Sequence, residues 1–238
     1  MKRRALLLNH ADGLLASDKD VQDMIKFLRS NSGGAWRDDE IVSKRNIALA
    51  ELNTFVSQLQ EDEIDYLLFY FSGHGGYERG TVIELNPRGE TISERAVSKL
   101  VPRQLNIYDC CRQPPEPEPR SFAAELLQES QDGMSMMVRK IYEKRIMEAR
   151  PQQMSLYACS VGECAYDLGR GGVYTQNLLG ATRSFEGDFL LAMQAHIAAR
   201  PLTIEEVAAR GENQHPDCFV AKLPQCYQLP FALNLNLN

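Results

Sequence analysis

A histidine flanked by glycines is the first feature of the sequence that could carry out chemistry. His74 lies in the motif Ser-Gly-His-Gly-Gly (72–76), directly after the apolar run 66–71. An imidazole titrates near neutral pH and can act as a general base. The neighbouring glycines let the backbone approach a substrate closely, and the amide of Gly75 can then point at it. Taken alone, the motif is also compatible with a histidine in a simple glycine turn.

A pair of cysteines follows a second apolar run in the same way. Cys110 and Cys111 come directly after residues 105–109. Because the carboxyl ends of neighbouring parallel strands meet at one edge of a sheet, we expect His74 and Cys111 to face each other there. Cys111 would act as the nucleophile and His74 as its base, while the amides of Gly75 and Cys111 would form an oxyanion hole. A buried structural thiol is the alternative for Cys111, but it explains neither the histidine nor the glycines.

The elements that would position these residues alternate between strands and helices. Short apolar runs predict strands, and apolar residues at helical spacing predict helices. This alternation predicts an α/β fold with a mostly parallel sheet and helices on both faces. A Thr-x-x-Glu capping box at Thr203 predicts a further short helix. The predicted strands are 5–9, 40–43, 66–71, 81–85, 104–108 and 155–158, and the predicted helices are 21–28, 48–59, 93–100, 175–185 and 188–199.

One long insertion interrupts the alternation. Residues 113–119 are rich in proline, so they cannot form a helix or a central strand. The polar stretch continues to residue 153, and a helix is predicted only over 137–149. An insertion of about forty residues between two core strands is unusually long, and such loops are commonly functional or disordered.

Composition restricts the class of protein. The 238 residues contain 26 Lys+Arg and 32 Asp+Glu, a net charge of −6, so the chain is not expected to bind nucleic acid. The apolar run near the N-terminus is too short for a signal peptide, and no run reaches the roughly 20 residues of a membrane span. We therefore expect a cytoplasmic protein without a membrane partner. The six cysteines include no Cys-x-x-Cys pair, so neither a disulfide framework nor a metal site is expected.

Taken in order, the motifs resemble those of the caspase-like cysteine peptidases, the clan that includes caspases, metacaspases and related prokaryotic peptidases. The resemblance implies a caspase-like three-layer α/β/α sandwich, with His74 and the second cysteine, Cys111, as the catalytic dyad. Residues 1–112 would be the large-subunit-like part, 113–153 the intersubunit linker and 154–238 the small-subunit-like part of one domain. The segments that carry the resemblance are 72–75, 109–112 and, more weakly, 33–36, 157–160, 171–179 and 229–231.

Two departures from the family bear on specificity. Asp109 stands where caspases carry a glutamine that helps to bind an acidic P1 residue, and Gln113-Pro114 replaces the Ser-Gly of metacaspases. A carboxylate beside the nucleophile pairs best with a guanidinium, so we expect cleavage after Arg in preference to Lys. Metacaspases also carry acidic residues after a cysteine that matches Cys159, which makes Glu163 and Asp167 candidates for the second wall of the S1 pocket. A capping or turn role is the alternative for Asp109.

The resemblance also makes the insertion a candidate processing site. Caspase-like zymogens are often cut between their subunits, and an enzyme that cleaves after basic residues could cut itself at Arg139, Lys140, Arg145 or Arg150. A flexible insertion or a regulatory helix is the alternative. Calcium activates many metacaspases, but the acidic cluster 38–40 has no EF-hand pattern, so the sequence leaves calcium dependence open. No other cofactor is expected.

These observations predict a cysteine endopeptidase that cleaves proteins and peptides after basic residues, in regulated proteolysis, cell death or prokaryotic defence. An upstream protease or another regulator is the expected partner besides the substrate. The alternative from a different class is a catalytically silent caspase-like protein that acts as a binding or scaffolding module. Retention of both His74 and Cys111 argues against it. Another thiol hydrolase with the same dyad is a third interpretation.

Overall fold

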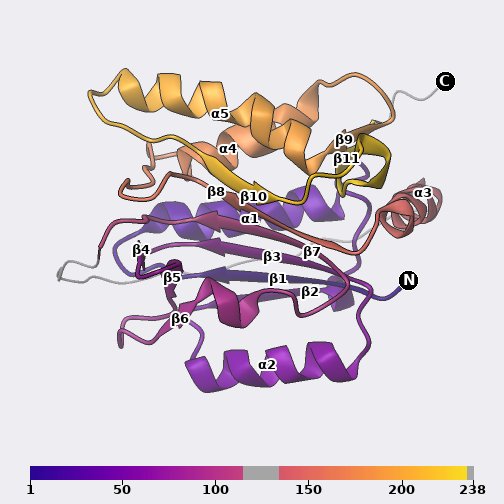
Figure 1. Cartoon of the computed structure of the whole chain (residues 1–238), viewed down its shortest axis with the longest axis horizontal. Helices are drawn as coiled ribbons and strands as arrows, with labels where there is room; N and C mark the ends of the chain where they lie inside the picture. The colour runs from indigo at the N-terminus through magenta and orange to yellow at the C-terminus, as the bar shows by residue number, and fades with distance from the viewer. Residues whose placement is uncertain (115–133, 235–238) are drawn as a thin grey trace.

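Six strands form the central sheet of the computed structural model, which describes residues 1–114 and 134–234 (Figure 1). Their order across the sheet is β10, β8, β7, β3, β1 and β2. Neighbouring strands are parallel except for β10, which runs antiparallel to β8. The predicted α/β class with a mostly parallel sheet is therefore confirmed. The bounds are Arg3–Asn9 for β1, Ile41–Arg45 for β2, Tyr66–Ser72 for β3, Arg103–Asp109 for β7, Gln152–Tyr157 for β8 and Asp217–Val220 for β10.

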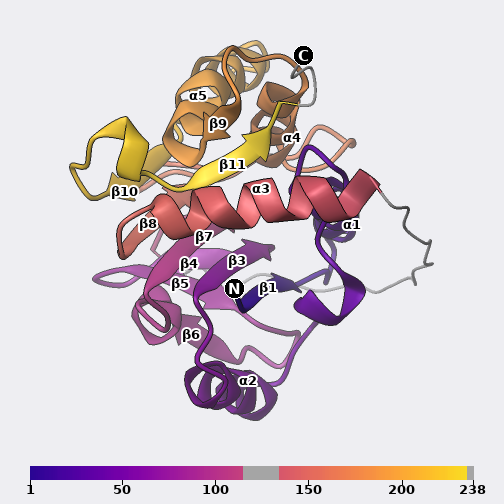
Figure 2. The same ribbon diagram turned by 90° about the vertical axis from the view of Figure 1, so that its right-hand side faces the viewer.

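Helices cover both faces of this sheet. One face packs against α1 (Leu15–Arg29), α4 (Val173–Gly180) and α5 (Ala192–Ala208), and the opposite face packs against α2 (Leu49–Glu61) (Figure 1 and Figure 2). The result is a sandwich of helices, sheet and helices. In the part of the chain that the structure describes, no helix is both long and apolar enough to cross a membrane.

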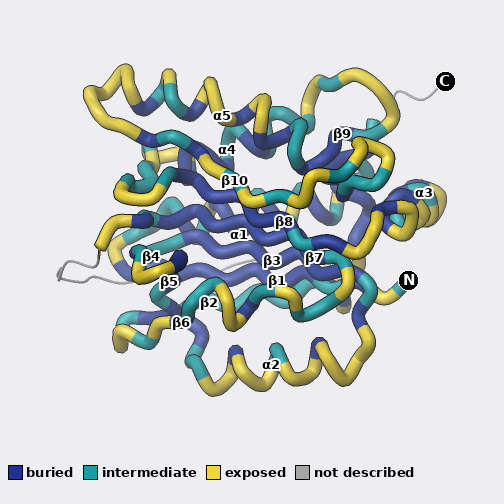
Figure 3. The backbone as a smooth tube through the Cα atoms, in the orientation of Figure 1, coloured by how far each residue is buried: buried dark blue, intermediate teal, exposed yellow. Residues whose placement is uncertain are grey.

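The continuous apolar run of β3 follows from its position between these layers. The even-numbered side chains from Tyr66 to Tyr70 belong to the core on the α1 face, and the odd-numbered ones from Leu67 to Phe71 belong to the core on the α2 face. Both sets are buried, as the dark centre of the sheet shows (Figure 3). A strand covered on both faces needs apolar residues at every position, which explains why the run shows no polar alternation.

The helix α3 (Met134–Glu148) occupies the later part of the insertion, close to the predicted 137–149. It lies at the amino ends of the strands, where Arg103 at the start of β7 donates a hydrogen bond to the carbonyl of Ala149 (2.8 Å). Tyr142 and Ile146 are buried in the core on the α1 face. The proline-rich residues 115–133 lie outside the described residues.

Two smaller sheets complete the described fold. β4 (Gly75–Tyr77), β5 (Thr81–Glu84) and β6 (Thr91–Ser93) form an antiparallel sheet directly after β3. β9 (Phe189–Leu191) pairs with β11 (Pro230–Leu233). His74 therefore lies in the short connection between the central sheet and the first of these small sheets.

Two predicted helices are partly wrong. Residues 93–100 form only a short 3-10 turn, Glu94–Val97, whose one buried side chain is Val97. A single turn is enough to bury that side chain, so a longer helix is not needed. The first residues of the helix predicted over 188–199 instead form β9, because pairing with β11 buries Leu190 and Leu191.

The short helix predicted to begin at Thr203 is also wrong. Thr203 lies inside α5, which continues through Pro201. Its hydroxyl donates a hydrogen bond to the carbonyl of Ala199 (3.0 Å), within the same helix. A threonine hydroxyl can bond to the preceding turn as well as cap a new one, and the local sequence does not distinguish the two.

A buried cluster of charges ties the start of the sheet to α3. Arg3 is 2% exposed, lies over the ring of Trp36 at 4.3 Å from its centroid, and donates a hydrogen bond to the carbonyl of Gly34 (3.0 Å). Its Nε lies 3.3 Å from the carboxylate of Glu40, and Arg139 of α3 binds the same carboxylate at 2.6 Å. Glu143 of α3 is a second carboxylate near both cations, 3.9 Å from Arg3 and 2.7 Å from Arg139, but it is less buried than Glu40. Loss of the charge on Glu40 would therefore remove the more buried of the two anions of the cluster.

Replacement of Glu40 by glutamine is expected to lower the free energy of unfolding by about 3 kcal/mol, because the buried arginines lose the more buried of their two carboxylate partners. Urea unfolding followed by circular dichroism measures the effect. Glu51→Gln is the matched control, since Glu51 pairs with Lys44 at the surface (2.8 Å) and an exposed pair contributes less than about 1 kcal/mol. Equal losses in the two variants would contradict the role of the cluster.

Candidate active site

The register of two neighbouring strands places His74 and Cys111 at equivalent positions. β3 and β7 are parallel, and Ser72 pairs with Asp109 at their carboxyl ends. His74 follows Ser72 by two residues, and Cys111 follows Asp109 by two. The amide of Gly73 donates to the carbonyl of Asp109 (3.1 Å), which extends the contact into the loops. The two loops therefore leave the sheet side by side at its carboxyl edge.

His74 is held by the loop that follows β1. Its Nε2 lies 3.0 Å from the backbone carbonyl of Asp12. Because a carbonyl oxygen only accepts hydrogen bonds, Nε2 carries the proton of the neutral ring, and Nδ1 is left as the basic nitrogen. The ring of the buried His10 packs edge-on against His74, with centroids 5.0 Å apart. The orientation of His74 and the position of its proton are thus both set by residues 10–12.

The glycines on either side of His74 are required by close packing. At Gly73, φ is +151° and an added Cβ would lie 2.8 Å from the carbonyl oxygen of His10. At Gly75, a Cβ would lie 2.8 Å from the Sγ of Cys110 and 2.9 Å from the carbonyl oxygen of Val82. A side chain at either position would push the histidine loop away from its neighbours.

The two adjacent cysteines differ in their surroundings. Cys110 is 1% exposed and packs beneath Gly75, whereas Cys111 is partly exposed. The thiol of Cys111 is hydrogen-bonded to the thiol of Cys164 and lies 3.9 Å from the carbonyl oxygen of Ala165. The hydrogen bond to Cys164, together with burial, raises the pKa of Cys111 above that of an ordinary thiol. Cys111 is therefore protonated at rest, and it needs a base to become a nucleophile.

Arg112 fastens the cysteine loop to the elements that follow it. Its guanidinium is buried, lies 4.0 Å from the ring centroid of Tyr157 and donates to the carbonyl of Cys159 (3.1 Å). Its amide donates to the carbonyl of Glu163, and its own carbonyl accepts from the amide of Gly162, each at 2.9 Å. The backbone next to the cysteine pair is thereby held between β7 and the loop after β8.

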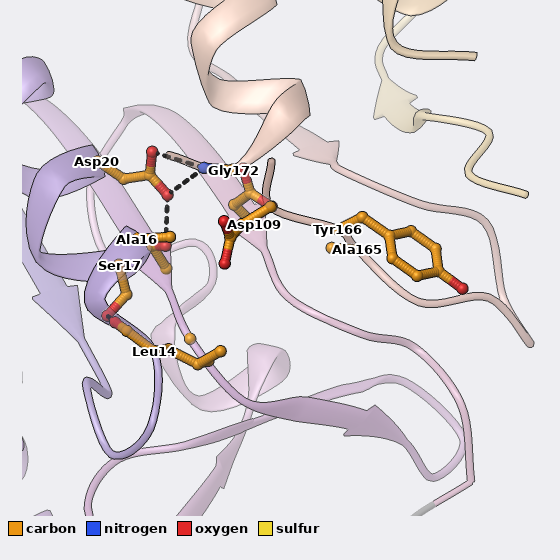
Figure 4. A pocket seen from close by; sticks show the side chains of 11 residues that line it. Leu14, Ala16, Ser17, Asp20, Asp109, Ala165, Tyr166 and Gly172 are labelled. Atoms are coloured by element: carbon orange, nitrogen blue, oxygen red, sulfur yellow. Dashed lines mark hydrogen bonds between the residues drawn. The ribbon is translucent and has the colours of Figure 1, made fainter. Parts of the chain in front are cut away.

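An acidic pocket of about 60 Å³ opens at the ends of β3 and β7 (Figure 4). Asp20 of α1 accepts hydrogen bonds from the amide of Gly172 and the hydroxyl of Ser72, both at 2.9 Å. Asp109 accepts from the amide and the hydroxyl of Thr175, at 3.1 and 2.6 Å. The loop after β1 and the loop after β8 form the other walls, with Leu14, Ser17, Ala165 and Tyr166.

Burial and proximity oppose ionisation of the two acids in this pocket. Burial, together with the charge of Asp109, raises the pKa of Asp20 to about 7. Burial also raises the pKa of Asp109 to about 6, although the hydrogen bonds from Thr175 act in the opposite direction. A cation between the two carboxylates would favour their ionised forms. The pocket is therefore suited to a positively charged group of a ligand.

The two acidic residues predicted for the second wall of this pocket lie in different places. Asp167 is exposed and lines the pocket, and its carboxylate accepts from the amide of Gly169 (2.6 Å). Glu163 does not line it: its carboxylate lies 2.7 Å from both the amide and the ring nitrogen of His215. The turn at 160–163 directs Glu163 toward His215, so the structure separates it from the pocket, and Asp20 takes the place expected for it.

The four basic residues predicted as self-processing sites lie in α3 or directly after it. Arg139 belongs to the buried charge cluster, and Arg145 is 9% exposed. Lys140 and Arg150 are exposed. α3 also lies at the amino ends of the strands, opposite the candidate site (Figure 1). Because a protease groove takes an extended chain, a cut at Arg139, Lys140 or Arg145 would require α3 to unfold, and we do not retain these three positions as processing sites. Arg150 follows the helix, is exposed and stays a candidate.

Asp20 is the pocket residue that sequence reasoning missed. It lies one position before Val21 and four before Met24, on the side of the helix whose apolar residues predicted α1. A carboxylate on an apolar helix face must find buried hydrogen-bond donors or lose its charge. The position of Asp20 on this face was therefore a signal of a buried acidic site. The residues that donate hydrogen bonds to Asp20, Ser72 and Gly172, are distant in the sequence, and their positions gave no such signal.

Comparisons with known proteins identify the fold. The family described as Caspase domain matches residues 2–226. Protein GSU0716 of Geobacter sulfurreducens has a similar structure, with a TM-score of 0.60 and 13% identity over 98% of this chain and 99% of that chain. Caspase-1 of Spodoptera frugiperda gives a TM-score of 0.57 and 14% identity over 100% of this chain and 92% of that chain. No curated protein matches the sequence significantly.

Replacement of Asp20 by asparagine is expected to stabilise the protein increasingly as the pH rises from about 5.5 to 7, with no further gain above pH 7. Folded Asp20 keeps its proton to about pH 7, whereas the unfolded chain loses it near the ordinary value of 3.8, so ionisation in the unfolded chain favours unfolding of the wild type within this window. The difference in unfolding free energy between the variant and the wild type should grow by on the order of 2 kcal/mol.

Urea unfolding at both pH values measures this difference. Asp38→Asn is the control, because Asp38 is exposed and should give the same difference from wild type at both pH values. A difference for Asp20→Asn that does not change with pH would contradict the raised pKa.

Proposed function

The chain belongs to the Caspase domain family, and from this premise we propose that it is a cysteine endopeptidase that acts through His74 and Cys111. The observation that carries the proposal is the register of β3 and β7, which sets a histidine loop and a cysteine loop side by side. An imidazole and a thiol in adjacent loops are the two groups that nucleophilic peptide hydrolysis needs. The contact of His74 with the carbonyl of Asp12 supports a role as the base, because it leaves Nδ1 unprotonated.

In the proposed mechanism, Nδ1 of His74 takes the proton of Cys111 as the sulfur attacks the carbonyl carbon of the scissile bond. The amides of Gly75 and Cys111 hold the negative charge that develops on the carbonyl oxygen. His74 then gives the proton to the leaving amine, and a thioester remains on Cys111. Water deprotonated by the same histidine hydrolyses the thioester and restores the thiol.

The acidic pocket is the proposed S1 site, in which Asp20 and Asp109 bind the side chain that precedes the scissile bond. A planar guanidinium can bind carboxylates through two hydrogen bonds, whereas an ammonium is a point charge, so arginine is preferred over lysine. Entry of the cation lowers the pKa of both acids, so the pair ionises as the substrate binds. Asp167 adds negative charge at the pocket, and an acidic P1 residue is repelled.

A catalytically silent protein of the same fold is the rival. The hydrogen bond between Cys111 and Cys164 favours it, because this bond stabilises the protonated thiol rather than a thiolate paired with an imidazolium. Our proposal therefore requires that His74 removes the proton during the attack itself. A measurement of peptide hydrolysis distinguishes an active peptidase from a catalytically silent protein.

The biological setting is proposed from the family alone. It comprises protein substrates in regulated proteolysis, cell death or prokaryotic defence, a cytoplasmic location, and an upstream protease or other regulator as partner. A processing cut outside α3, within the insertion 113–153, belongs to the same proposal. The described residues contain no group of three or more His, Cys, Asp or Glu side chains that could hold a metal ion. Peptide hydrolysis is measured with and without calcium.

The wild-type protein is expected to cleave fluorogenic peptides that end in arginine. Cys111→Ala and His74→Ala should each lower kcat/KM by about 10³-fold or more, because each removes one half of the dyad. Cys226→Ala is the control, since Cys226 is an exposed cysteine on another element and should leave the rate unchanged. If no peptide is cut with or without calcium and no self-cleavage occurs, the silent rival is supported instead.

Arginine peptides should be cleaved faster than lysine peptides, and aspartate peptides should not be cleaved. Asp20→Asn and Asp109→Asn are each expected to raise KM for arginine peptides and to lower kcat/KM by about 10- to 100-fold, because each removes a charged hydrogen bond of about 1.5–3 kcal/mol. Asp38→Asn, an exposed control, should behave as wild type. A preference for aspartate peptides would contradict the assigned pocket while leaving the dyad intact.

A further inference from the structure

Cys111 has a second thiol beside it that the hydrolytic mechanism does not use. Cys164, in the loop after β8, is partly exposed like Cys111. We propose that these two cysteines form a reversible disulfide when a hydroperoxide oxidises Cys111, and that this disulfide switches the site off. The loss of activity rests on the proposed function, whereas the formation of the disulfide does not.

Backbone hydrogen bonds place the two cysteines next to each other. The amide of Arg112 donates to the carbonyl of Glu163, and the amide of Gly162 donates to the carbonyl of Arg112, each at 2.9 Å. Cys111 precedes Arg112 and Cys164 follows Glu163, so the two lie opposite each other as in an antiparallel pair. Such neighbours have Cβ atoms roughly 4.5–5.5 Å apart, and a disulfide needs about 3.5–4.5 Å. A small shift of one segment therefore closes the bond.

The side chains are arranged for this bond. The Cys111 thiol is hydrogen-bonded to the Cys164 thiol, and it lies 3.9 Å from the carbonyl oxygen of the next residue, Ala165. Gly162 and Gly169 bracket the loop that carries Cys164. Both have positive φ (+88° and +77°), and no other atom lies within 4 Å of the position that a Cβ would take. Glycine at these positions allows backbone conformations that other residues rarely adopt.

The other cysteines are not suited to the same reaction. Cys110 and Cys159 are buried, with 1% and 0% exposed, so a peroxide cannot reach them easily. The thiol of Cys159 is also engaged with the carbonyls of Cys110 and Glu163, at 3.3 Å each. Cys218 lies on β10, where its sulfur is 3.9 Å from the sulfur of Met193, and Cys226 lies on a 3-10 turn after β10. Only the pair of Cys111 and Cys164 combines access with a thiol partner among the described residues.

The reaction has two steps. Cys111, deprotonated by His74, attacks one oxygen of the hydroperoxide; the O–O bond breaks, the sulfur is oxidised to a sulfenic acid and the peroxide is reduced to an alcohol or water. The sulfur of Cys164 then attacks the sulfenic sulfur, the S–S bond forms, and the oxygen leaves as water with the proton of Cys164. A dithiol returns two electrons and restores both thiols. Without Cys164, the sulfenic acid is open to irreversible oxidation to a sulfinic acid.

The test treats the full chain with hydrogen peroxide and then reduces half of each sample with dithiothreitol. Peptide mapping by mass spectrometry detects the linkage between Cys111 and Cys164, and hydrolysis of an arginine peptide gives the activity relative to the same variant before treatment. The wild type should show the linkage, lose activity about tenfold or more, and regain most of it on reduction. Cys164→Ser should lose activity without regaining it and accumulate sulfinic acid at Cys111. Cys226→Ser, the matched control, should behave as wild type.

Two results would overturn the proposal. One is the absence of the linked peptide from treated wild type. The other is recovery of Cys164→Ser to the same extent as wild type. If the linked peptide forms in a protein that cuts no peptide before treatment, the disulfide is supported, while the regulatory role and the proposed function both fail.

Discussion

The parallel pairing of β3 with β7 is the constraint on which the site depends. It sets Ser72 beside Asp109, and with them the two loops that carry His74 and Cys111. A slip of one residue would turn every side chain of a strand to the opposite face and would remove Asp109 from the pocket. The register is held because both faces of these strands are packed in the core. The layers that stabilise the fold thus also position the chemistry.

Buried charged groups are arranged differently at the two ends of the sheet. At the amino ends, Arg3 and Arg139 lie between the carboxylates of Glu40 and Glu143, so opposite charges balance and the cluster joins α3 to the sheet. At the carboxyl ends, Asp20 and Asp109 share a pocket and raise each other's cost of ionisation. Like charges kept together in a buried place lower stability, and such an arrangement is typical of a site that binds the opposite charge.

The proposed nucleophile, Cys111, is subject to a similar balance. Burial and the contact with Cys164 stabilise the protonated thiol of Cys111, whereas the contact with Asp12 prepares His74 to accept a proton. Reactivity is therefore divided between two loops, and neither loop is sufficient alone. The same contact that keeps Cys111 protonated also gives it a neighbour with which it can be oxidised. The proposed hydrolysis and the proposed oxidation thus both depend on one short segment after β8.

The order and type of most elements follow from the amino-acid sequence, because strand and helix patterns are local periodicities. It also singled out the histidine between glycines and the cysteine pair. The contacts between distant groups depend on the packing of the elements in three dimensions. Packing brings Asp20 to Asp109, directs Glu163 toward His215 and places Arg139 in a buried cluster. The physical reason is that periodicity depends on neighbours along the chain, whereas a pocket depends on how separate elements pack against one another.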